Sequence, residues 1–138
     1  LSIKVVDFHD GSILSNATVF IEEINISDIT NDKGEVSFNK LCPKTYEILS
    51  KTKGVRIAGF SLMKGGAKLP VHTDNVSDTY VFTYHLGIKC PEGNILYTKD
   101  GPVVEENGKH IVFDAKYEHW AENKSDEDRI ILHIEYHR

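Results

Sequence analysis

The sequence is poor in the residues that would place it in a special class of protein. It has two cysteines, Cys42 and Cys90, among 138 residues. Two cysteines do not form a disulfide framework, and their spacing is not that of a zinc knuckle. We therefore expect a cytoplasmic protein, in a reducing compartment that would also suit ferrous iron.

Long apolar runs and basic clusters are also missing. No apolar run is long enough to cross a bilayer, and none follows a basic start as in a signal peptide. The net charge is −5, and the lysines and arginines are scattered along the chain. We therefore expect a soluble protein whose partner is neither a membrane nor a nucleic acid. Its oligomeric state is left open.

Most of the chain consists of short segments rich in valine, isoleucine, threonine and aromatic residues. These segments predict strands at residues 2–8, 17–24, 35–38, 55–63, 68–72, 80–88, 95–98, 109–113 and 129–136. Turn-forming residues lie between them at 64–66, 74–78, 91–94, 100–102 and 122–128. Residues 41–52 predict one short helix, because Pro43 suits a first helical turn and Gly54 follows the end. Many short strands joined by turns favour a β-sandwich or barrel.

The stretch from His72 to Asp74 offers two metal ligands. Because alternate residues of a strand project to the same side, the imidazole of His72 and the carboxylate of Asp74 could reach one ion. His119 lies 119 − 72 = 47 residues later, far enough to return on another strand. Two histidines and one carboxylate form the facial triad of non-haem Fe(II) oxygenases, although zinc accepts the same ligands. Taken alone, a His-x-Asp sequence more often ends a hairpin, and His119 would be a histidine bonded to backbone.

Arg129 begins the apolar segment 129–136, 129 − 119 = 10 residues after His119. A guanidinium beside such a metal could bind the distal carboxylate of a 2-oxoacid as a bidentate pair. The simpler reading is a surface salt bridge to the acidic loop at 125–128. His85 likewise has a simpler reading, as a core histidine with its hydrogen bonds satisfied.

Several segments, taken together, resemble the aspartyl/asparaginyl β-hydroxylase family of Fe(II)- and 2-oxoglutarate-dependent oxygenases. The resemblance covers roughly 70% of the chain, from about Leu41 to its end. The matching pieces are CPKT at 42–45, FS at 60–61, PVHTD at 70–74, YHLG at 84–87, GK at 108–109, VFD at 112–114, YEH at 117–119, Asn123 and RIIL at 129–132. They occur in the order and at the approximate spacing of the family, which is more specific than any single motif.

The resemblance implies a mainly β, cupin-like double-stranded β-helix, or jelly roll, with iron at His72 and His119. It also implies that Arg129 holds 2-oxoglutarate, with help from Ser61 and His85. Two positions depart from the pattern. Some members of the family have glycine at the place of Asp74, so the carboxylate here predicts a full triad. Thr83 stands where the family often has arginine.

The resemblance also suggests how the chain is divided. Residues 41–138 are expected to form the jelly-roll domain. Residues 1–40 resemble, in a general way, the small carboxypeptidase-regulatory-like β-sandwich. We expect them to be strands packed on the jelly roll, and part of a second small module is the lesser alternative.

These observations predict an enzyme that uses Fe(II), 2-oxoglutarate and O₂ to hydroxylate an unactivated C–H bond. By resemblance, the substrate is an Asp or Asn side chain in a peptide or protein, or a free amino acid. The alternative from another class is a non-catalytic, cupin-like binding protein, for which Thr83 is the one hint. A zinc hydrolase comes third, because no convincing general base lies near the ligands in the sequence.

Overall fold

The computed structural model describes residues 2–4, 18–21, 26–29, 32, 35–37, 42–74 and 81–137. They belong to two compact units, residues 1–53 and 54–138. None of the helices within these described ranges has both the length and the apolar character needed to span a membrane.

The first unit contains two short strand pairs and one helix. Strand β1 (Ser2–Lys4) pairs with β4 (Glu35–Ser37), and β2 (Thr18–Ile21) pairs with β3 (Ile26–Ile29), both antiparallel. Helix α2 (Pro43–Lys51) begins at its proline, where the missing N–H leaves no intrahelical bond unmade. The predicted helix is thereby confirmed. The ends of the predicted strands at 2–8 and 17–24 lie outside the described residues, and β3 was not predicted.

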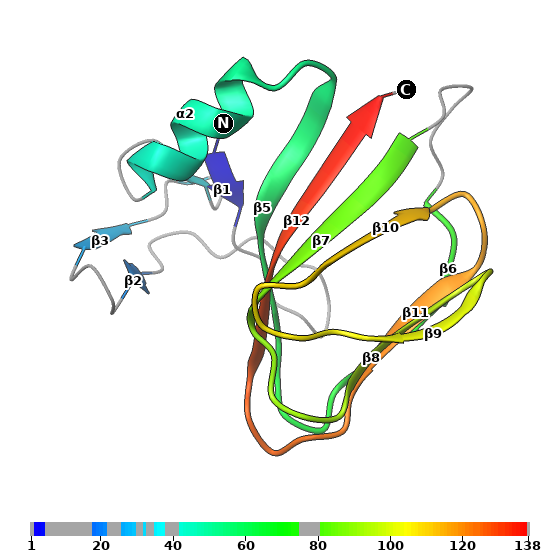
Figure 1. The fold of residues 1–138 in the computed structure, drawn as a ribbon. Helices are drawn as coiled ribbons and strands as arrows, with labels where there is room; N and C mark the ends of the chain where they lie inside the picture. The colour runs from blue at the N-terminus through cyan, green and yellow to red at the C-terminus, as the bar shows by residue number, and fades with distance from the viewer. Residues whose placement is uncertain are drawn as a thin grey trace. The chain divides into compact units, whose positions relative to one another are not determined.

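The second unit consists of two four-stranded antiparallel sheets (Figure 1). The larger sheet has the order β10 (His110–Asp114), β7 (Val81–Lys89), β12 (Arg129–His137), β5 (Val55–Met63). The smaller sheet has the order β6 (Lys68–His72), β11 (His119–Asn123), β8 (Asn94–Thr98), β9 (Gly101–Val104). Strands far apart in sequence, such as β5 and β12 or β6 and β11, are neighbours in these sheets. This arrangement is the predicted double-stranded β-helix.

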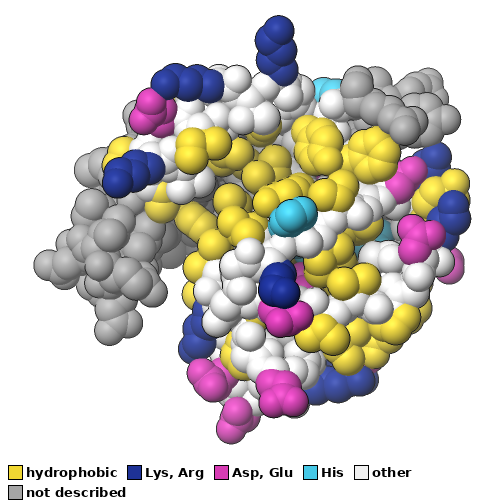
Figure 2. Space-filling model, in the orientation of Figure 1, with side chains coloured by type: hydrophobic (Ala, Val, Ile, Leu, Met, Phe, Trp, Pro, Cys, Tyr) yellow, Lys and Arg dark blue, Asp and Glu magenta, His cyan; other side chains and the backbone are white. Residues whose placement is uncertain are grey.

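Apolar side chains from both sheets meet between them. The cluster consists of Met63, Leu96, Phe113, Ala115 and Ala121. Elsewhere the larger sheet leaves apolar side chains exposed, among them Ile57, Leu62, Ile88 and Val112. Figure 2 shows hydrophobic side chains across the middle of the visible face.

Two segments that the sequence predicted as turns are partly strand in the structure. Residues 100–102 were predicted as a turn, but β9 begins at Gly101, which has a φ of 113° that suits glycine. Pro102 is accommodated because β9 is an edge strand, where a missing N–H costs little. Residues 122–128 were also predicted as a turn, but β11 continues to Asn123. Its inward residues, His119, Ala121 and Asn123, are not strong strand formers, so this strand is not recognisable from the sequence.

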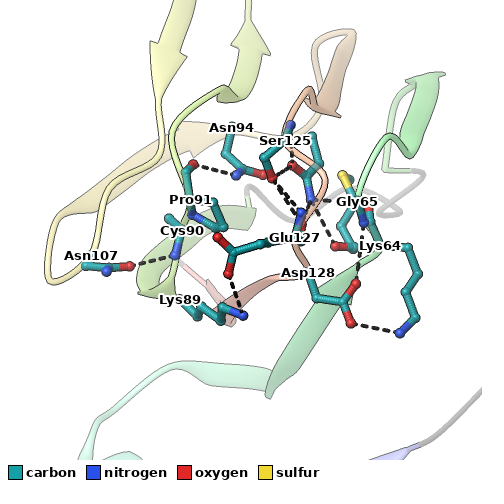
Figure 3. Close-up of polar contacts among 12 residues, drawn as sticks. Lys64, Gly65, Lys89, Cys90, Pro91, Asn94, Asn107, Ser125, Glu127 and Asp128 are labelled. Carbon is teal, nitrogen blue, oxygen red and sulfur yellow. Dashed lines mark hydrogen bonds and ion pairs between the residues drawn. The ribbon is translucent and has the colours of Figure 1, made fainter.

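The buried side chain of Asn123 fastens the end of β11 to two neighbouring segments. Its amide nitrogen donates to the carbonyl oxygens of Met63 and Lys64, both at 3.2 Å, and of Glu127 at 2.7 Å. Its amide oxygen accepts from the N–H and the hydroxyl of Ser125, at 3.1 and 2.7 Å. Figure 3 shows polar contacts of this region, including the Lys64–Asp128 ion pair.

Replacing Asn123 with alanine should therefore destabilise the protein. Asn123→Ala leaves several buried backbone groups without a partner, and we expect a loss of about 2–4 kcal/mol in the free energy of unfolding. Urea denaturation measures it. Asn107→Ala is the matched control, because Asn107 is exposed and its side chain accepts one hydrogen bond, from the N–H of Cys90. Equal losses in the two variants would contradict the role of Asn123.

Candidate metal centre

The structure brings the three predicted ligands together. His72 ends β6 and His119 begins β11, and the two are direct cross-strand partners. Their ring centroids are 4.2 Å apart. Asp74 lies two residues beyond the end of β6, where its N–H donates to the carbonyl of Ala115 at 3.0 Å. One ligand atom from each of the three side chains lies within 4.8 Å of the other two.

Backbone hydrogen bonds orient both imidazole rings. Nδ1 of His72 donates to the carbonyl of Pro70 at 2.8 Å, and Nδ1 of His119 donates to that of Tyr117 at 3.0 Å. Each neutral ring then has an Nε2 lone pair free. The two Nε2 atoms lie 3.9 and 4.0 Å from the carboxylate oxygens of Asp74. Histidines that bind metals are usually held in this way, with one nitrogen bonded to a fixed acceptor.

The donor set fits a divalent transition metal. Ligand atoms at about 2.1 Å from an octahedral ion lie about 3 Å apart, so the three side chains would need to close by about 1–2 Å. His119 is buried, whereas His72 and Asp74 are partly exposed, so the group is reachable from one side. Two imidazoles and one carboxylate suit Fe(II), and they also suit zinc.

The residues predicted to hold the cosubstrate share the inner face of the larger sheet. Directly paired residues of antiparallel strands project to the same side. His85 pairs with His133, and Ser61 pairs with Ile131. Arg129, Ile131 and His133 alternate along β12, so Ser61, His85 and Arg129 face the same interior.

Phe113 connects this face with the metal ligands. Its ring contacts His119 edge-on at 5.1 Å between centroids and His85 edge-on at 5.2 Å. A single aromatic ring therefore separates the candidate metal centre from His85, one of the predicted cosubstrate residues.

Glu105 is a buried partner of Arg129 and His85 that sequence reasoning missed. Nη1 of Arg129 donates to one of its carboxylate oxygens at 3.0 Å, and Nδ1 of His85 donates to the other at 3.0 Å. The simpler reading of Arg129 as a surface salt bridge is wrong, because its side chain is buried. The acidic loop instead pairs with lysines, Asp128 with Lys64 and Glu127 with Lys89. Nothing in the sequence distinguishes Glu105, which is buried, from its exposed neighbour Glu106.

The hydrogen bonds continue from His85 along the inner face. Nε2 of His85 lies 3.1 Å from Nδ1 of His133, and Nε2 of His133 lies 3.3 Å from a carboxylate oxygen of Glu135. Glu135 in turn forms an ion pair with Arg56. Three hydrogen bonds join Glu105, His85, His133 and Glu135 in a row, and the carboxylates at both ends can only accept. The two imidazole rings must therefore supply three N–H groups. They coexist only while one of the two rings is protonated.

Burial decides how charge is distributed here. Desolvation lowers the pKa of His85, while its hydrogen bond to Glu105 opposes that change. Burial therefore favours the neutral form of His85. Desolvation also lowers the pKa of Arg129, with Glu105 opposing it. The guanidinium stays charged, because its ordinary pKa is far above neutrality.

A cavity of about 150 Å³ lies close to the triad. It is lined by Thr98, Lys99, Asp100, Phe113, Asp114 and Tyr117. Two of these residues also touch His119, since Phe113 packs on its ring and the carbonyl of Tyr117 accepts its N–H. The lining offers charges of both signs, so it suits a small polar group.

The chain is similar in sequence to known hydroxylases. Residues 29–138 match the family described as aspartyl/asparaginyl beta-hydroxylase. The ornithine lipid ester-linked acyl 2-hydroxylase of Rhizobium tropici is 34% identical over 100 residues, which are 70% of this chain and 35% of that protein. The crystal structure of a predicted oxalate decarboxylase from Thermotoga maritima has a TM-score of 0.52 at 14% identity, covering 67% of this chain and 74% of that one. The last likeness concerns the fold alone, and it agrees with the jelly roll.

Replacing a ligand of the triad should weaken metal binding. We expect His119→Ala to bind Fe(II) at least about 100-fold more weakly than the unaltered protein, because losing a ligand costs more than losing an outer partner. Asp74→Asn should also bind more weakly. Anaerobic calorimetry with Fe(II) measures this. His110→Ala is the control, because His110 is exposed and stacks on Tyr84. Unchanged affinity in His119→Ala would rule out the site.

Proposed function

The chain belongs to the aspartyl/asparaginyl β-hydroxylase family, and from this premise we propose that it is an Fe(II)- and 2-oxoglutarate-dependent dioxygenase. The observation that carries the proposal is the meeting of His72, Asp74 and His119 in one group of possible ligands. In the balanced reaction, 2-oxoglutarate and O₂ become succinate and CO₂ while a C–H bond becomes C–OH. One oxygen atom enters succinate and the other enters the product.

The triad would hold the iron, and the iron supplies the oxidative chemistry. The contribution of the chain is to hold and orient. The carbonyls of Pro70 and Tyr117 keep the two rings in the tautomer that binds a metal. Asp74 contributes one negative charge towards a dication. Phe113 packs edge-on against His119 and makes that side of the site apolar.

Arg129 is the proposed anchor for the distal carboxylate of 2-oxoglutarate. Its guanidinium is buried and uses Nη1 for Glu105. Its Nε is also buried, and it has no hydrogen-bond partner among the residues that the structure describes. An unpaired donor of this kind supports the binding of a further acceptor, such as a carboxylate. Ser61 and His85 lie on the same face of the sheet.

For the substrate we propose an Asp or Asn side chain in a peptide or protein, or a free amino acid. The polar cavity near His119 supports it, because Lys99 and Asp100 could pair with the carboxylate and ammonium groups of an amino acid. A second candidate is the acyl chain of an ornithine-containing lipid, which the name of the Rhizobium tropici relative suggests. The similarity covers 35% of that protein, so its substrate is a candidate only.

The visible spectrum provides the first test. Anaerobic addition of Fe(II) and saturating 2-oxoglutarate should give a metal-to-ligand absorption band. We expect the band to be absent in His72→Ala and weakened in Arg129→Ala, because the first variant loses a ligand and the second loses the anchor. His110→Ala should keep it. A folded protein that gives no band would argue strongly against the oxygenase.

Product analysis separates the proposed enzyme from the other classes. With O₂ and a substrate, the enzyme should form succinate and hydroxylated product in equal amounts. A cupin-like binding protein would form neither. A zinc hydrolase would act without O₂ or 2-oxoglutarate and would regain its activity with zinc. Asp- and Asn-containing peptides, free amino acids and an ornithine lipid are the substrates to compare.

A further inference from the structure

Glu105 lies where the carboxylate of the cosubstrate is expected. We propose that Glu105 is an internal ligand of the anion site formed by Arg129 and His85, and that a dicarboxylate binds there by displacing it. The inference rests on the proposed function, since it takes Arg129 as the anchor of 2-oxoglutarate. It makes Glu105 the residue that sets the affinity of this site.

Glu105 is bound as a ligand carboxylate would be. Arg129 and His85 each donate to a different oxygen of the same carboxylate, at 3.0 Å in both cases. The side chain of Glu105 is 2% exposed and that of Arg129 is 4% exposed, so little water competes for these bonds. Two of the three residues assigned to the cosubstrate, Arg129 and His85, are therefore already bound to a carboxylate supplied by the chain.

The backbone holds Glu105 in this position. Its N–H donates to the carbonyl of Asn94 at 3.0 Å. The residues that follow are fixed on β7, because Gly108 donates to the carbonyl of Gly87 at 2.8 Å and Gly87 donates to that of Lys109 at 3.0 Å. A side chain at Gly87 would collide with the backbone of Glu106. Gly87 thus allows this segment to lie close to the sheet, where the side chain of Glu105 is buried.

The guanidinium of Arg129 can balance one carboxylate charge and not two. Its Nε is a buried donor with no partner among the described residues, so it can still donate to a ligand. The pair that Arg129 forms with Glu105 is nevertheless electrically neutral. A second carboxylate against the same guanidinium would repel Glu105 at close range in a poorly solvated site. Exchange of one carboxylate for the other is therefore favoured over simultaneous binding.

Glutarate is a suitable probe because it has the two carboxylates of 2-oxoglutarate and lacks the 2-oxo group that would engage a metal. Calorimetry on the metal-free protein isolates the anion site. We expect Glu105→Gln to bind glutarate at least about tenfold more tightly than the unaltered protein, a change of about 1.4 kcal/mol. The variant keeps the shape of the side chain and removes the competing charge. Adding Arg129→Met to it should abolish the gain.

Glu106→Gln is the matched control. It removes the same charge from the adjacent, exposed position of the same segment, so it should bind glutarate as the unaltered protein does. If Glu105→Gln binds no more tightly than Glu106→Gln, the inference is overturned.

A second measurement uses the unaltered protein, in case Glu105→Gln does not fold. Nitrogen NMR of the histidine rings follows Nδ1 of His85, which donates to Glu105. Displacement of Glu105 by glutarate should shift this signal. A signal that stays unchanged at the highest glutarate concentration overturns the inference.

The same experiments separate this inference from the proposed function. Tighter glutarate binding by Glu105→Gln, without succinate formation by any form of the protein, would support the anion site and reject the oxygenase. Succinate formation by the unaltered protein, with equal glutarate affinity in both glutamine variants, would do the reverse.

Discussion

The register of β12 between β5 and β7 is the constraint on which the interior of the jelly roll depends. It turns Arg129, His133 and Glu135 towards the facing sheet and leaves Ile130 and Ile134 on the other side. A slip of one residue would exchange the two sets. Hydrophobicity alone would favour that exchange, since it would bury isoleucines in place of charges. The observed register is supported instead by pairing along both edges of β12, and by acceptors for the polar groups that it buries.

A polar interior of this kind is not explained by stability. Burying an ion pair such as Arg129–Glu105 costs desolvation that its attraction only partly offsets, and apolar replacements are often neutral or stabilising. Removing one partner is different, because it leaves a buried charge unpaired and costs about 3–5 kcal/mol. The run from Arg129 through Glu105, His85 and His133 to Glu135 is therefore tolerated only as a complete set. Its presence beside a group of possible metal ligands is better explained by ligand binding.

The parts that sequence predicted well are those that depend on short-range pattern. The strand at 55–63 and the helix near 41–52 follow from propensity and turn residues, and the motif around His72 led to the ligands that meet at His119. The parts that it missed depend on tertiary context. In the sequence, Glu105 looks like any surface glutamate. It is buried because Gly87 has no side chain and so lets the segment of Glu105 pack closely on the sheet. The strand at 119–123 buries residues of low strand propensity, which only the facing sheet accounts for.

The charges around Phe113 bear on how the two parts of the site would act together. On the side of His119, a divalent ion with Asp74 would carry one net positive charge. On the other side Arg129 carries one as well, if Glu105 is set aside. A dianion such as 2-oxoglutarate would then neutralise these two charges. With Glu105 in place, the same complex would hold two carboxylates against the guanidinium of Arg129, where they repel each other at close range. This repulsion favours displacement of Glu105 if both parts of the site bind a single cosubstrate.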